Sequence, residues 1–241
     1  MGRDPVSSTA HFVTSHSVLT LDARHPYTAK AMIDAQHMHR NIMSGFYHWV
    51  PDGQPDARAQ MGVLSTWSVD LKAGVLILVV QARVPADWSG IPADALKDKP
   101  HTLTVDRTLN TGDVVSFRTV VNPTKTISPG KEAVENKIRG KRIPHTAPHH
   151  AKDWFTRRLQ HEGEPPTGPS GVSRIGATTD SDTLNIQMLG SLKSTSRKGL
   201  VVARAEIKGR LTVTDPHTFV NALNDGIGRA RAYGCGLLLI R

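Results

Sequence analysis

The sequence contains a single cysteine, Cys235, and no long uninterrupted run of apolar residues. One cysteine cannot form an internal disulfide, and the N-terminus lacks the charged-then-apolar pattern of a secretory signal, so we expect a reducing, cytoplasmic location. The longest apolar run, residues 75–80, has the length of a strand, whereas a membrane-spanning helix needs about 20 residues. We therefore expect no membrane partner.

Aromatic residues and clustered metal ligands are also scarce. Aromatic side chains make up 5% of the chain, and neither half has the aromatic-rich strand on which single-stranded RNA stacks its bases. His149 and His150 have no cysteine or histidine set at zinc spacing near them, and Asp180 and Asp182 lack the partners that a two-metal nuclease requires. The sequence therefore predicts no metal ion and no cofactor.

Positive charge, in contrast, is in excess. The 241 residues include 30 Lys and Arg against 21 Asp and Glu, a formal net charge of +9. Residues 1–120 hold 11 basic and 11 acidic side chains, so the whole excess lies in residues 121–241, and ten basic side chains fall within residues 118–158. Such a concentration is typical of a surface that binds a polyanion. A solvated basic face without a partner is the alternative interpretation.

Hydrophobic periodicity predicts an α+β protein. Alternation and β-branched content predict strands over residues 12–21, 64–69, 75–84, 101–106, 113–121, 172–178, 184–189, 200–213 and 237–240. Apolar spacings of three, four and seven predict helices over residues 28–49 and 148–161. Asp215, Pro216 and Gly226 mark the start and end of a third helix.

Both halves then follow the β-α-β-β-(α)-β order of a ferredoxin-like (RRM-like) domain. We predict tandem ferredoxin-like domains over residues 1–112 and 113–241, with the second carrying the basic elements and a glycine-rich loop. The second helix of the first domain has the least support, because residues 85–100 contain three prolines.

A glycine-rich segment, GIGRARAYGCG, lies between the third helix and the last strand, and its glycines are Gly226, Gly228, Gly234 and Gly236. Such a loop can bring backbone N–H groups close to phosphates, and Arg229 and Arg231 add charge to it. It is not a dinucleotide fingerprint, which follows a strand and opens a helix. Taken alone, a helix cap with a tight return to the strand is the favoured interpretation.

Four other segments carry a more specific signal, namely FRTVVNPTKT (117–126), GKRIPH (140–145), WFTRRL (154–159) and MHRNI (38–42). Together with the glycine-rich segment, they resemble motifs of the CasE-type precursor CRISPR RNA endoribonucleases of type I-E CRISPR systems, which belong to the RAMP superfamily. The match runs in the family's order from residue 117 to the C-terminus, whereas in the first half only residues 38–42 match well.

The resemblance implies a metal-independent endoribonuclease in which His39 is the catalytic histidine. Such cleavage uses the adjacent 2′-hydroxyl as nucleophile and leaves 2′,3′-cyclic phosphate and 5′-hydroxyl ends. An imidazole, with an ordinary pKa of about 6.5, suits the proton transfers, and Arg40 or a basic residue of the second domain would neutralise the phosphate. From the residues alone, His39 shares a helical face with Met32 and Phe46, so a packed core histidine is the alternative.

Two positions depart from the family pattern. Family members often carry a tyrosine three residues before the histidine, where this chain has Gln36, and sometimes a lysine five residues after it, where this chain has Ser44. Glutamine can donate a hydrogen bond but cannot titrate, so either His39 works with less acid-base help or another residue replaces the tyrosine. His37 is a poor replacement, because it points about 200° away from His39 around a helix.

The resemblance also implies the partners, which are CRISPR repeat stem-loops in precursor and mature RNA and the other subunits of Cascade. A-form stems are recognised mainly through phosphates and shape. We expect this contact from basic residues of the second domain, namely Arg118, Lys125, Arg139, Lys141, Arg142, Arg157, Arg158, Arg229 and Arg231. The alternatives are a non-catalytic hairpin-binding subunit on the same fold and an unrelated metal-dependent nuclease.

Overall fold

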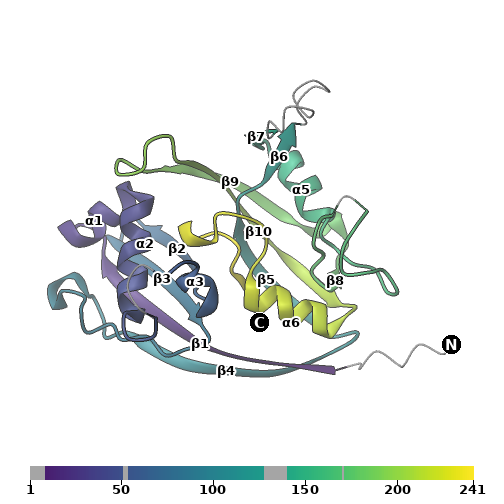
Figure 1. The fold of residues 1–241 in the computed structure, drawn as a ribbon, viewed down its shortest axis with the longest axis horizontal. Coiled ribbons are helices and arrows are strands. Elements are labelled where there is room, and N and C mark those ends of the chain that lie inside the picture. The colour runs from purple at the N-terminus through teal and green to yellow at the C-terminus, as the bar shows by residue number, and fades with distance from the viewer. Residues whose placement is uncertain (1–8, 51–53, 128–139, 170) are drawn as a thin grey trace.

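Two antiparallel β-sheets, each covered on one face by helices, form the protein (Figure 1). This computed structural model describes residues 9–50, 54–127, 140–169 and 171–241. Within these residues no helix is long and apolar enough to cross a membrane.

The first sheet is built from the N-terminal part of the chain. Its strands are β1 (Thr9–Asp22), β2 (Leu64–Asp70), β3 (Val75–Ala82) and β4 (His101–Asn110). They lie in the order β2-β3-β1-β4, and β1 pairs antiparallel with both neighbours. This is the split β-α-β arrangement of a ferredoxin-like domain, so the predicted strands are confirmed here.

The predicted single helix over residues 28–49 is wrong, because the chain forms α1 (Pro26–Ile33), α2 (Ala35–Met43) and the 3-10 turn η1 (Ser44–Phe46). The break falls at Asp34, whose backbone is extended with φ −117° and ψ 109°. The Asp34 carboxylate accepts hydrogen bonds from the backbone N–H of Gln36 at 2.8 Å and of His37 at 3.4 Å. The carboxylate thus satisfies the Gln36 amide and adds a second acceptor for the His37 amide, which also donates to Asp34 O at 3.0 Å. Trp49, the last residue of the predicted helix, is 50% exposed.

Two short elements complete this half of the chain, the helix α3 (Ala57–Gln60) and the 3-10 turn η2 (Ala93–Ala95). The latter stands between β3 and β4, where a ferredoxin-like domain has its second helix. Trp88 and Ile91 from this proline-containing connector are buried in the core below α2. The connector therefore covers the sheet by side-chain packing rather than by a regular helix.

The second sheet uses the C-terminal part of the chain, with strands β5 (Val114–Val121), β8 (Ala177–Thr178), β9 (Asn185–Lys193), β10 (Val201–Val213) and β11 (Leu238–Ile240). Its order is β11-β5-β10, and β8 and β9 share the remaining edge of β10. The helices are α5 (Pro148–Thr156) and α6 (Pro216–Asp225), with the 3-10 turns η3 (Ser181–Thr183) and η4 (Arg231–Tyr233). Asp215 caps α6 through the Thr218 N–H at 3.0 Å, and Gly226 ends it, as predicted.

Two predicted elements of this half are shorter than expected. The helix predicted over residues 148–161 ends at Thr156, and the strand predicted over residues 172–178 is reduced to the two residues of β8. The backbone N–H of Gln160 donates to Ala177 O at 2.9 Å, and that of Ile175 donates to Arg158 O at 2.8 Å. The segment after α5 thus leaves the helix to pair with the segment before β8. The strands β6 (Thr124–Ile127) and β7 (Lys141–Pro144), which pair as a hairpin, were not among the predicted strands.

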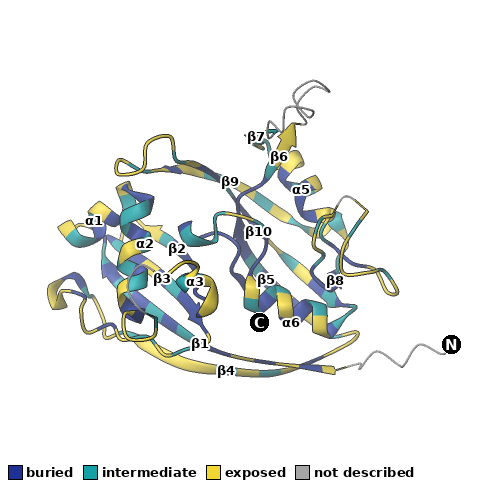
Figure 2. Cartoon of the chain, viewed as in Figure 1, coloured by how far each residue is buried: buried dark blue, intermediate teal, exposed yellow. Residues whose placement is uncertain are grey.

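The two sheets enclose two hydrophobic cores that share strands. Leu19 and Leu21 of β1 lie in the first core, while Phe12 of β1 and Leu109 of β4 lie in the second. Figure 1 shows both long strands running on toward α6, and Figure 2 shows β4 exposed along most of its length. Each half of the chain is therefore completed by residues of the other.

Candidate functional site

A basic groove lies between the β6–β7 hairpin, α5, α6 and the loop after α6. Five of the predicted RNA-binding residues line it, namely Lys125, Arg157, Arg158, Arg229 and Arg231. Among the described residues, no carboxylate forms an ion pair with any of these five side chains. Unpaired guanidinium and ammonium groups along one groove create a field that attracts a polyanion.

Aromatic packing holds one of these cations in place. The Arg158 guanidinium lies 3.4 Å from the centroid of the Trp154 ring, and it also donates to Trp154 O. Burial, and then the charge of Arg157, lowers the pKa of Arg158 to about 10, so the group is still protonated at neutral pH. Arg157 is exposed next to it. Stacking of this kind orients a guanidinium without neutralising it.

The remaining predicted RNA-binding residues lie elsewhere. Arg118 on β5 pairs with Glu206 on β10, with 2.6 Å between Nε and Oε1, and does not line the groove. Lys141 and Arg142 are exposed on β7, opposite residues of β6. Arg139 lies outside the described residues. Glu206 also pairs with Lys208, so this one carboxylate is shared by two cations, but it holds the Arg118 side chain within the sheet. The hairpin, in contrast, presents its charges to solvent.

The glycine-rich loop packs tightly against two tryptophans. Gly228 and Gly234 have φ of +74° and +72°, which non-glycine residues rarely adopt. A Cβ at Gly228 would lie 2.7 Å from the Trp154 ring, and one at Gly234 would overlap the Trp67 ring of β2. The favoured interpretation of a tight structural return therefore fits these glycines.

The backbone of this loop is used to join it to the rest of the protein. At its base, Ile227 N–H donates to Gly236 O at 2.8 Å, and Gly236 N–H donates to Val120 O at 2.7 Å. Gly226, also at positive φ, ends α6. The exposed Arg229 and the half-buried Arg231 project from the loop into the groove. The loop therefore presents charged side chains and keeps several of its own amides for internal bonds.

His39, the predicted catalytic histidine, is half-buried on α2. Burial lowers its pKa below the ordinary 6.5, and the nearby charge of Arg58 on α3 lowers it further. The pKa of Arg58 is itself lowered by burial and then by the charge of Arg231. The charge of Arg231 in the groove thus acts on Arg58, and that of Arg58 acts on His39. The lowered pKa favours the neutral form of the His39 imidazole. Arg40, the predicted neighbouring cation, is exposed on α2.

Gln36 and His39 both meet a tyrosine from the far end of the chain. Tyr233 of η4 stands edge-on to the His39 ring, with 6.1 Å between centroids and 68° between planes. Its hydroxyl donates to Gln36 Oε1 at 3.0 Å and accepts from Arg197 Nη1 at 2.9 Å. An aromatic ring with a hydroxyl therefore stands beside His39, although the family's tyrosine position holds glutamine.

Sequence reasoning missed Tyr233 and Arg58. Tyr233 lies inside the quoted glycine-rich segment, but nothing in the sequence connects it with residues of α2. Arg58 follows a polar stretch with no recognisable motif. Only the packing of η4 and α3 around α2 brings both side chains to His39.

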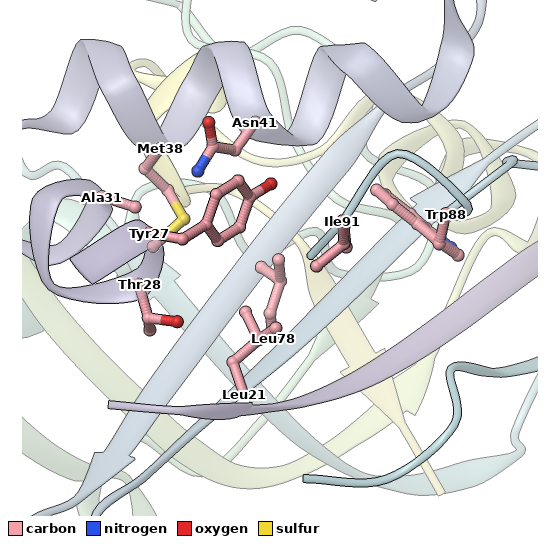
Figure 3. Close-up of a pocket in the computed structure, with 9 residues that line it drawn as sticks. All are labelled: Leu21, Tyr27, Thr28, Ala31, Met38, Asn41, Leu78, Trp88 and Ile91. Atoms are coloured by element: carbon pink, nitrogen blue, oxygen red, sulfur yellow. The ribbon is translucent and has the colours of Figure 1, made fainter. Parts of the chain in front are cut away.

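A separate hollow beneath α1 and α2 does not form part of this site. Figure 3 shows Tyr27, Met38 and Leu78 among the side chains that converge there. The hollow is lined mainly by apolar groups and has room for about one water molecule. It is too small for a nucleotide, so we interpret it as a feature of core packing.

Comparison with solved structures shows where this fold occurs. CRISPR endoribonuclease Cse3 bound to 19 nt RNA superposes with a TM-score of 0.68 and 22% identity, over 95% of this chain and 98% of that chain. Thermus thermophilus Cse3, bound to an RNA representing a pre-cleavage complex, superposes with a TM-score of 0.65 and 21% identity, over 95% of this chain and 99% of that chain. For Cas6e from Escherichia coli K-12 the TM-score is 0.56 and the identity 18%, over 94% of this chain and 98% of that chain. The predicted tandem ferredoxin-like fold is confirmed.

No curated protein sequence matches the chain. A family model described as CRISPR associated protein, however, matches residues 16–241, which is nearly all of it. The matched region includes His39, the whole basic groove and the glycine-rich loop. The chain therefore belongs to this family of CRISPR-associated proteins.

Proposed function

We propose that this protein is an endoribonuclease that cleaves CRISPR repeat stem-loops in precursor RNA, without a metal ion, and stays on the product as a subunit of Cascade. The observation that carries the proposal is a half-buried His39 whose pKa is lowered by burial and by Arg58, a cation on which Arg231 of the basic groove acts in turn. The shared fold with RNA-bound Cse3 supports it.

In the proposed reaction His39 acts first as a general base. Its lowered pKa leaves the imidazole free to accept the proton of the 2′-hydroxyl next to the scissile phosphate. The 2′-oxygen then bonds to phosphorus, the bond from phosphorus to the 5′-oxygen breaks, and the leaving 5′-oxygen takes up the proton that the His39 imidazolium gives back, directly or through water. The products are a 2′,3′-cyclic phosphate and a 5′-hydroxyl, so the protons and bonds balance without a cofactor.

Arg58 and Arg231 are the cations best placed to stabilise charge on the phosphate during this step. Their charges act on one another, and that of Arg58 acts on His39, so all three side chains belong to one electrostatic neighbourhood. Fixed positive groups next to a developing phosphorane charge lower the barrier because they need no reorganisation. Arg40, exposed on the same helix as His39, is a less direct candidate.

The groove would hold the RNA stem by its phosphates. Arg157, Arg158 and Arg229 line it, and the exposed β6–β7 hairpin with Lys141 and Arg142 stands at one side. A-form RNA offers phosphates and 2′-hydroxyls to such a surface more readily than base edges. Because the groove belongs to the second sheet and His39 to the first, the scissile phosphate would lie where the two halves meet.

The test compares wild type, His39→Ala and His37→Ala on a labelled repeat hairpin in EDTA, with protein in excess over RNA. His37 is the matched control, because it lies on the same helix and does not contact Tyr233. We expect cleavage by wild type and His37→Ala, and unimpaired hairpin binding without cleavage by His39→Ala. Binding without any cleavage by wild type supports a non-catalytic hairpin-binding subunit, and cleavage only after Mg²⁺ is added overturns the metal-free mechanism.

A further inference from the structure

The first turn of α2 is held by a loop from the second half of the chain. The Asp34 carboxylate, which caps α2, accepts hydrogen bonds from Thr195 Oγ1 at 2.7 Å and from Ser196 Oγ at 3.1 Å. These bonds, with that from the Gln36 N–H, hold the pKa of Asp34 well below its usual range despite burial. The cap of the helix that carries His39 is therefore completed by the β9–β10 loop, residues 194–199.

The same loop also reaches Tyr233. Arg197 Nη1 donates to the Tyr233 hydroxyl at 2.9 Å, and that hydroxyl donates to Gln36 Oε1 at 3.0 Å. Gln36 and His39 are three residues apart and so lie on one side of α2. The Tyr233 hydroxyl is thus tied to Gln36, while its ring stands against His39 one turn further along.

Tyr233 is well suited to fix a neighbouring side chain, because it is itself fixed. It is 9% exposed and belongs to the first hydrophobic core. Gly234, which follows it, packs against Trp67. The ring and hydroxyl of Tyr233 are therefore held in fixed positions. The His39 imidazole beside this ring loses both contact with water and rotational freedom.

Building on the proposed function, we propose that Tyr233 is the positioning residue of His39. Its ring orients the imidazole and shields it from water, and its hydroxyl, bonded to Gln36 and Arg197, fixes α2 against the glycine-rich loop. A tyrosine delivered by the C-terminal loop thus stands where the family's own tyrosine position holds Gln36. The role assigned to Tyr233 is orientation and desolvation of His39, with no proton transfer of its own.

The test separates the ring from the hydroxyl with Tyr233→Phe and Tyr233→Leu, and uses the exposed Tyr47→Leu as a control. The first readout is the titration of His39 itself, followed by NMR from pH 4.5 to 8. The charged group that acts on His39 is Arg58 of α3, on which Arg231 of η4 acts in turn, and none of the variants substitutes either residue. We expect Tyr233→Leu to raise the pKa of His39 toward 6.5, and Tyr233→Phe and Tyr47→Leu to leave it unchanged.

The second readout is the single-turnover cleavage rate at saturating protein, alongside the hairpin Kd. We expect Tyr233→Phe to slow cleavage about 10-fold with the Kd unchanged, because loss of the hydroxyl's two hydrogen bonds, to Gln36 and from Arg197, loosens α2, and misplaced catalytic groups are costly. The effects of Gln36→Leu and Tyr233→Phe should be less than additive when combined, since both remove the bond between Gln36 and Tyr233. A wild-type rate and an unchanged His39 titration in Tyr233→Leu overturn the inference.

The two proposals fail in different ways. If wild type does not cleave the hairpin, the proposed function fails, and the His39 titration still shows whether Tyr233 shields the imidazole. If wild type cleaves, His39→Ala does not, and Tyr233→Leu leaves both the titration and the rate unchanged, only the role of Tyr233 is wrong. Hairpin binding by every variant shows that each one is folded.

Discussion

The glycine-rich loop offers a direct test of whether its glycines serve packing or phosphate binding, through the substitution Gly234→Ala. Gly234 has a φ of +72°, and an added Cβ would overlap the Trp67 ring. The left-handed backbone costs about 1–2 kcal/mol for alanine, and forcing a methyl group into a packed site costs about 1–3 kcal/mol more. Reduced freedom of the unfolded chain offsets about 0.4–1 kcal/mol of this.

We therefore expect Gly234→Ala to lower the free energy of unfolding by about 2–4 kcal/mol. For a chain of 241 residues that corresponds to a drop in Tm of roughly 5–15 °C. Thermal unfolding followed by circular dichroism measures it. Gly190→Ala on β9 is the matched control, because a Cβ there meets no atom within 4 Å, and its Tm should change by less than about 2 °C.

Phosphate binding by the loop amides predicts a different result. A Gly234→Ala protein with the Tm of wild type but a weaker Kd for the repeat hairpin, measured well below the Tm, would refute the packing argument. It would show that the Trp67 ring moves aside at no cost and that the loop backbone itself approaches the RNA.

Three further outcomes follow from the groove and the histidine. Arg157→Ala should weaken hairpin binding and reduce the salt slope of log Kd by about one. Arg118→Ala should leave the slope unchanged, because Arg118 is paired with Glu206 and does not line the groove; equal slopes for both variants would contradict this assignment. Burial and Arg58 lower the pKa of His39, and a general base must be unprotonated. We therefore expect kcat/KM to rise from acid pH through a midpoint below 6.5 and to level off at neutral pH. A kcat/KM that falls over this range excludes the general-base role. Arg58→Gln should slow cleavage by about 10- to 100-fold and move that midpoint upward, and an unmoved midpoint would show that Arg58 does not act on His39.

The strands were predictable because a period of two is a local property of the sequence. Residues of β2, β3, β5 and β10 alternate or run apolar over enough positions to identify the sheets and, with the helix positions, their ferredoxin-like order. The break between α1 and α2 was not predicted, because apolar spacing continues across it from Met32 to Ala35. Its signal was Asp34 as an N-cap, and the bonds that the β9–β10 loop makes to the Asp34 carboxylate could not be read from the sequence.

The candidate site was also predictable only in part. His39 could be proposed from the resemblance of residues 38–42 to a family motif, and most of the groove cations from the charge excess and the other matching segments. Arg118 looked equivalent to the other basic residues, because its partner Glu206 lies 88 residues away and only strand pairing brings the two together. Tyr233 is 197 residues from Gln36, and no local pattern records that contact. The first contact arises from strand pairing within one sheet and the second from how the two halves of the chain pack.

One segment connects the groove with the histidine. Within residues 226–236, Ile227 packs in the second core and Tyr233 in the first, while Arg229 and Arg231 between them face the groove. Trp154 of α5 closes over one end and Trp67 of β2 over the other. In the proposed function, a phosphate bound by these arginines would be held on the same backbone that places Tyr233 against His39, so a few residues of loop would set its distance from the imidazole. The positive charge of the second half and the formally neutral first half would then act together, because binding of the RNA would also determine which phosphate lies at His39.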